Sequence, residues 1–111
     1  MQISTETFGK VLVAHTPDEL TDETATSFLN ALAQPIEQGH CQLVLQMDRS
    51  ETFDSIGLTA LVELQDELRE KGGNLKVSGL GSTGRKIFEI TRLDKRFDLF
   101  ESVIDAVTSF Q

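Results

Sequence analysis

The sequence predicts a single α/β domain built around a mixed sheet. Short segments that are apolar or alternate between apolar and polar residues predict strands. They are separated by longer segments that repeat apolar residues every three or four positions, which predict helices. Two strand-like segments open the chain with only Gly9-Lys10 between them, a spacing that favours an antiparallel hairpin. Each later strand follows a helix, which makes neighbouring strands parallel. We expect four to five strands and about four helices in one domain, residues 1–111.

The N-terminal part is expected to form the hairpin and one helix. Segment 3–8 alternates weakly, and segment 11–14 is continuously apolar. Asp22 is expected to be the N-cap of a helix over 23–38, which repeats apolar residues on one face. Pro35 predicts a kink or an early end of that helix, because proline removes a backbone donor.

The rest of the chain continues the alternation of helices and strands. Segment 41–47 is short and apolar, which is typical of a central strand covered on both faces. Ser82 is expected to cap the third helix. The remaining elements are expected as a helix over 55–71, a strand over 75–78, a helix over 82–92, a short edge strand over 97–100 and a helix over 102–110.

Composition narrows the function classes. The net charge is −8, from 18 acidic and 10 basic residues, which argues against binding nucleic acid or an anionic membrane. No apolar run is long enough to span a bilayer. The single cysteine, Cys41, cannot form an internal disulfide, and no basic segment followed by an apolar stretch opens the chain. These observations predict a cytoplasmic protein.

The most informative segment runs from Phe53 to Leu58, where a loop becomes a helix. Unpaired N–H groups and the positive end of the helix dipole favour an anion there, so a phosphate on Ser55 could be held without refolding. If Asp54 is the N-cap, Ser55 is the first helical residue and its hydroxyl faces solvent. The alternative is that Asp54-Ser55 is a plain helix cap.

A helical wheel gives this helix two faces. One stripe has the usual width of a core-facing surface. It consists of Gly57, Ala60, Leu61, Leu64 and Leu68, and the opposite side carries Ser55, Leu58, Thr59, Val62 and Asp66. Leu58 and Val62 are neighbours four residues apart and adjoin Ser55, so we expect a docking surface. The alternative is that they are ordinary exposed aliphatic side chains.

The run Phe53-Asp54-Ser55-Ile56-Gly57-Leu58 resembles the Asp-Ser-x-Gly-Leu signature of the STAS domain, and more narrowly the bacterial anti-sigma factor antagonists. Segments 19–25, 68–77 and 85–93 are also similar to that family. The resemblance extends over nearly the whole chain, with its most specific part from Phe53 to Leu93. It implies a mixed sheet with helices packed mainly on one side.

The resemblance also implies a function. Ser55 would be phosphorylated by a serine kinase of the histidine-kinase-like ATPase type that is also an anti-sigma factor. The unphosphorylated chain would sequester this kinase, phosphorylation would release it, and a serine phosphatase would reset the switch. The implied partner-binding residues are Asp22, Asp54, Ile56, Gly57, Leu58, Thr59 and Val62.

Two rival functions stay open. Some STAS proteins are constitutive subunits of scaffolds or transporters, and Ser55 would then be only a cap. An enzyme would need a base for Ser55, and the candidates are His15 and His40, without a Gly-x-Ser-x-Gly elbow or metal-ligand spacing. Segment 79–84 fits Gly-x-Gly-x-x-Gly but lacks a surrounding dinucleotide half-domain, so it is interpreted as a helix-opening loop, with nucleotide binding as the alternative. We therefore expect neither catalysis nor a cofactor or metal.

Overall fold

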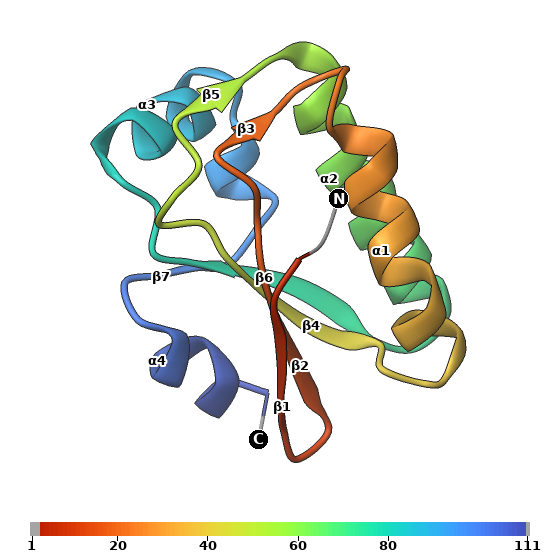
Figure 1. The fold of residues 1–111 in the computed structure, drawn as a ribbon. Helices are drawn as coiled ribbons and strands as arrows, with labels where there is room; N and C mark the ends of the chain where they lie inside the picture. The colour runs from red at the N-terminus through yellow and green to blue at the C-terminus, as the bar shows by residue number, and fades with distance from the viewer. Residues whose placement is uncertain (1–2, 111) are drawn as a thin grey trace.

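The computed structural model describes residues 3–110 and contains one five-stranded sheet with helices on both faces (Figure 1). The strand order is β1-β2-β4-β6-β7, with β1 antiparallel to β2 and the other neighbours parallel. The strands are β1 (Thr5–Phe8), β2 (Val11–His15), β4 (Gln42–Gln46), β6 (Asn74–Ser78) and β7 (Leu99–Phe100). This arrangement confirms the mixed α/β sheet, its opening hairpin and its short last edge strand.

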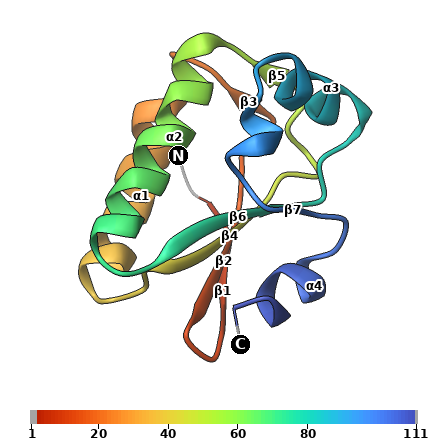
Figure 2. The same cartoon turned by 180° about the vertical axis from the view of Figure 1, so that it is seen from behind.

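Three helices cover one face of the sheet and the fourth covers the other, as the views in Figures 1 and 2 agree. The helices are α1 (Ala25–Glu37), α2 (Ser55–Glu70), α3 (Ser82–Ile90) and α4 (Val103–Thr108), and a 3-10 turn, Leu93–Lys95, follows α3. The larger core lies beneath α1, α2 and α3, so the expectation that helices pack mainly on one side is confirmed.

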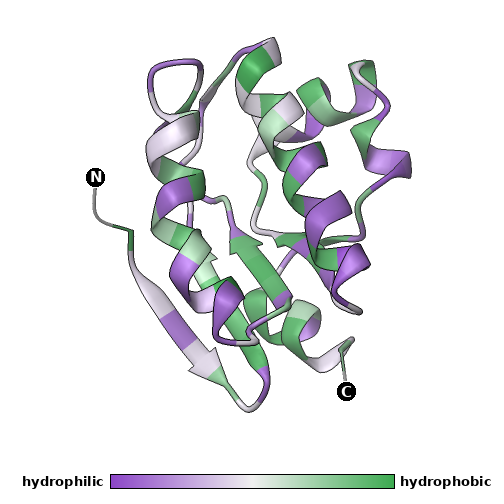
Figure 3. Ribbon diagram, turned by 90° about the vertical axis from the view of Figure 1, so that its right-hand side faces the viewer, coloured by the Kyte–Doolittle hydropathy of each residue, from purple (hydrophilic) through white to green (hydrophobic). Residues whose placement is uncertain are grey.

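The central strand β4 sends alternate side chains into the two cores. Leu43 and Leu45 join the larger cluster, whereas Val44 packs with Ala106 and Val107 of α4. Figure 3 shows hydrophobic residues concentrated on the inner strands, while the N-terminal edge strand is mostly polar. The prediction of a central strand covered on both faces is therefore confirmed.

Two predicted helix caps were wrong. Asp22 does not cap α1, because that helix begins at Ala25 after Thr24. The Thr24 hydroxyl instead donates to the Glu19 carbonyl at 2.7 Å and accepts from the Thr21 N–H at 3.0 Å, which fixes the preceding loop as a turn. In α3 the N-cap is a glycine, and Ser82 is the first helical residue.

A second sheet, which the sequence did not predict, lies beside the start of α2. It consists of two parallel strands of two residues each, β3 (Glu19–Leu20) and β5 (Thr52–Phe53). The Glu51 N–H donates to the Asp18 carbonyl at 3.0 Å, which extends the pairing. The loop before α1 is thereby joined to the loop before α2.

Gly57 lets α2 lie directly on the end of β3. A Cβ atom at Gly57 would stand 1.9 Å from the Leu20 carbonyl oxygen and 2.5 Å from its carbon. Both neighbours are backbone atoms, so no side-chain rotation could relieve the clash. Glycine is required here because two backbones approach each other closely.

We therefore expect Gly57→Ala to destabilise the fold. Alanine normally favours a helix interior over glycine by about 1 kcal/mol, but the clash would displace α2 from β3 and outweigh this gain. The free energy of unfolding in urea should fall by at least about 2 kcal/mol. Gly81→Ala is the control, because its Cβ would meet nothing within 4 Å, and it should cost less than about 1 kcal/mol. Equal losses for the two variants would contradict the role given to this contact.

Candidate functional site

The site is organised by the carboxylate of Asp54. This residue is the N-cap of α2, with an extended backbone at φ −127°, and its Oδ1 accepts from the Gly57 N–H at 2.8 Å. Its Oδ2 accepts from the Asp22 N–H at 2.9 Å. One side chain therefore ties the first turn of α2 to the loop before α1. Asp22 takes part in the site, but through its backbone N–H.

The same hydrogen bonds set the charge of Asp54. Donation from Gly57, and then from Asp22, lowers the pKa of Asp54 below its ordinary value, because both bonds are stronger to the carboxylate than to the neutral acid. The group is therefore ionised at neutral pH and lies at the positive end of the α2 dipole. A fixed negative charge already occupies the cap position before any modification.

Ser55 follows as the first residue of α2 and is exposed. Because Asp54 supplies the cap, the Ser55 hydroxyl is not needed for that role. Ile56, the next residue, has 54% of its surface exposed, and Thr59 is exposed one turn further along. An accessible hydroxyl thus lies beside an apolar side chain at the start of the helix.

The prediction that Leu58 and Val62 lie on a face away from the core was wrong. Both are half-buried and pack against the edge of the larger core, together with Leu93. The wheel assumed one covered face, but the segment after α3 covers a second flank of α2. On this flank a shallow hollow of about 280 Å³ is lined by Ser55, Leu58, Thr59, Val62, Thr91 and Leu93.

Thr91 and Leu93 were not predicted to belong to the site. They come from the end of α3 and the 3-10 turn, more than thirty positions along the chain, and no sequence spacing links them to Ser55. Further along the same flank, Arg96 forms an ion pair with Asp66. This pair holds the α3 end of the hollow against α2, although as a surface contact it adds little stability by itself.

The two histidines do not approach Ser55. His40 lies with Lys71 and Gly72 in a hollow at the other end of α2. The 16 residues of α2 span about 24 Å, so this end is distant from Ser55. His15 ends β2, with its Nε2 3.9 Å from a Glu6 carboxylate oxygen. The structure thus gives Ser55 no histidine partner.

Residues 3–110 contain neither a metal-binding cluster nor a membrane-spanning helix. No group of three or more His, Cys, Asp or Glu side chains is arranged to hold a metal ion. No helix combines the length and the apolar character needed to cross a membrane.

Comparison with known proteins places the chain in a family. The model of the STAS domain family matches residues 2–106. The chain belongs to the STAS domain family. A curated relative, the anti-sigma F factor antagonist of Paenibacillus polymyxa, is 21% identical over 112 residues, which cover 100% of this chain and 96% of the relative.

Solved structures of other proteins share the fold. An anti-sigma factor antagonist from Mycobacterium paratuberculosis is 26% identical, with a TM-score of 0.84 over 97% of this chain and 92% of that one. The Bacillus cell fate determinant SpoIIAA in its phosphorylated form is 18% identical, with a TM-score of 0.75 over 99% and 100%. A sulfate transporter family protein from Wolinella succinogenes is 19% identical, with a TM-score of 0.79 over 91% and 84%. The last two show the fold alone.

The lowered pKa of Asp54 makes its contribution depend on pH. Because the folded-state pKa lies below the ordinary value of 3.8, the carboxylate stabilises the STAS domain above that value, and this contribution is lost as the pH falls through the folded pKa. Asp54→Asn should lower the melting temperature by a few degrees at neutral pH, since it removes the charge and one acceptor.

The free energy of unfolding should therefore differ less between the original chain and Asp54→Asn below about pH 4 than at neutral pH. Urea unfolding at a series of pH values from about 7 down to about 2.5 measures it. Asp48→Asn, at an exposed loop position, controls for the loss of one charge. A difference that stayed constant down to the lowest pH would show that the Asp54 carboxylate does not supply the stabilisation.

Proposed function

We propose that this STAS domain is an anti-sigma factor antagonist whose binding to an anti-sigma factor is controlled by phosphorylation of Ser55. The observation that carries the proposal is that Ser55 is exposed at the first position of α2 while Asp54 performs the capping. Modification of Ser55 therefore removes no hydrogen bond on which the helix depends. The name of the Paenibacillus relative supports the antagonist role.

Phosphorylation would act on the surface of the domain and leave its fold in place. A phosphate adds about −1.5 to −2 charges at neutral pH. The positive end of the helix dipole stabilises this charge by up to about 1 kcal/mol at an exposed site. The ionised Asp54 next to it destabilises the phosphate by repulsion between like charges. Since these effects are similar in size and opposite in sign, neither drives a rearrangement of α2.

The effect on a partner would be larger. The phosphate would stand between Ile56, which is exposed, and the hollow that contains Leu58 and Val62. A partner that buries these apolar groups would have to desolvate a dianion with them, and such a mismatch weakens binding by several kcal/mol. We propose a serine kinase of the histidine-kinase-like ATPase type as this partner and a serine phosphatase as the enzyme that resets Ser55.

A constitutive STAS subunit is the second candidate function, because the fold is shared with a sulfate transporter family protein. In that case Ser55 would stay unmodified, and the same apolar groups would form a permanent interface. The two candidates differ in what a negative charge at Ser55 does to binding, which a substitution can test.

We expect Ser55→Asp to weaken binding to the purified histidine-kinase-like ATPase encoded nearest this gene by at least about 100-fold, measured by calorimetry, and Ser55→Ala to retain it. Ser82→Asp is a matched control, since Ser82 is also an exposed first residue of a helix and lies outside the hollow. It should change the affinity by less than about twofold. Equal affinity of Ser55→Asp and Ser55→Ala would contradict the phosphorylation switch and favour the constitutive subunit.

Incubation with the same kinase and ATP should add one phosphate, located at Ser55 by mass spectrometry. Ser55→Ala should abolish the modification, whereas Ser82→Ala should leave it unchanged. Phosphate found on another residue while Ser55 stays unmodified would refute the assignment of the site.

A further inference from the structure

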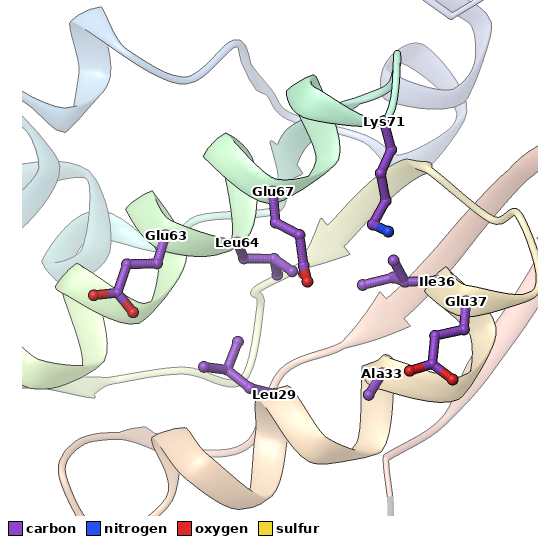
Figure 4. A pocket seen from close by; sticks show the side chains of 8 residues that line it. All are labelled: Leu29, Ala33, Ile36, Glu37, Glu63, Leu64, Glu67 and Lys71. Carbon is purple, nitrogen blue, oxygen red and sulfur yellow. The ribbon is translucent and has the colours of Figure 1, made fainter.

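A groove between α1 and α2 is not used by the proposed switch. It has a volume of about 380 Å³ and runs along the bodies of the two helices (Figure 4). Its floor is apolar, from Leu29, Ala33 and Ile36 on α1 and from Leu64 on α2. Ala33 contributes only a methyl group at the middle of the α1 face, so space remains between the helices where a larger side chain would fill it.

The rim of this groove is acidic. Glu63 and Glu67 rise from α2 and Glu37 from α1, and Lys71 at one end supplies the single positive charge. Glu63 and Glu67 are four residues apart on one helix face, where like charges repel. None of these four side chains forms a salt bridge among the described residues. Apart from Lys71 at one end, no cationic side chain of residues 3–110 lines the groove, so its rim is negatively charged overall.

The size of the groove limits what can occupy it. Leu29 and Ile36 are seven residues apart on α1, which corresponds to about 10 Å, or two helical turns. A groove of this length between two helices accepts the apolar side chains that another helix presents at a spacing of three or four residues. A cationic side chain on each flank of that helix would meet the glutamates of the rim.

We propose that the α1–α2 groove binds a basic amphipathic helix of a partner protein, with leucine-like side chains on the floor and Lys or Arg side chains against the rim. A second copy of this chain is a poor occupant, since each chain carries a net charge of −8 and would bring further carboxylates to an acidic rim. The proposal rests on the groove alone and does not depend on Ser55 or its modification.

The test uses a fluorescent 16-residue amidated peptide of leucine, lysine and alanine with leucines on one helical face, titrated at low ionic strength and followed by anisotropy. We expect saturable binding that the double variant Glu63→Lys/Glu67→Lys weakens at least about tenfold. The matched control is Glu89→Lys/Glu101→Lys, which changes the net charge equally at exposed positions outside the groove. This control should weaken binding by no more than about threefold, because it removes only long-range electrostatic attraction.

Ala33→Phe tests the floor independently of charge. Ala33 is exposed, so the added ring should fill the groove, keep the melting temperature within a few degrees, and reduce peptide affinity about tenfold. Equal weakening by the two charge-reversal variants would show that the peptide senses only net charge and would overturn the proposal. So would an absence of saturation, or a concentration-dependent dimer of the chain that Ala33→Phe dissociates.

Peptide binding that survives in Ser55→Asp would support two independent surfaces. If the proposed switch failed while the groove still bound the peptide, the groove proposal would stand. If the peptide failed to bind while Ser55→Asp still weakened the kinase complex, only the groove proposal would fall.

Discussion

The first turn of α2 lies against the backbone at the end of β3, and the geometry around Ser55 depends on this contact. Gly57 makes the approach sterically possible, because a Cβ would overlap the Leu20 carbonyl. Asp54 then joins the two backbones by accepting from both sides. The contact fixes the direction of α2, and this direction determines that Ser55 faces solvent and Leu58 faces the hollow. Steric fit and hydrogen bonding thus act on the same few atoms.

The cap also determines how the site responds to charge. Asp54 takes the Gly57 N–H and places a carboxylate at the positive end of the helix dipole, so the usual attraction of a helix start for an anion is already partly satisfied. A second anion, on Ser55, would therefore be stabilised less by this helix start than by one without a capping carboxylate. A negative charge added there would therefore remain exposed and act mainly on whatever binds this surface, rather than on the conformation of the domain.

Much of this architecture follows from local sequence signals, and the remainder comes from contacts between distant segments. Periodicity identified the hairpin, the central strand and α2, and the Asp54-Ser55 pair marked the start of that helix. The pairing of Leu20 with Phe53 was missed, because strands of two residues have no period and their partner lies more than thirty positions away. The role of Asp22 was missed because a backbone N–H carries no side-chain signal. The half-burial of Val62 was missed since its neighbour Leu93 comes from another element.

The body of α2 and its N-terminal end differ in what determines the shape and charge of their surfaces. At the end, Gly57 and the Asp54 cap impose a geometry together with the backbone of the loop before α1. Along the body, the shape of the groove depends on Ala33 and its charge on Glu63 and Glu67, which the packing of α2 on the sheet leaves free to vary. Solved structures of antagonists and of a transporter family protein share this one fold. A substitution at these positions of α1 and α2 would alter the groove without any change at Ser55.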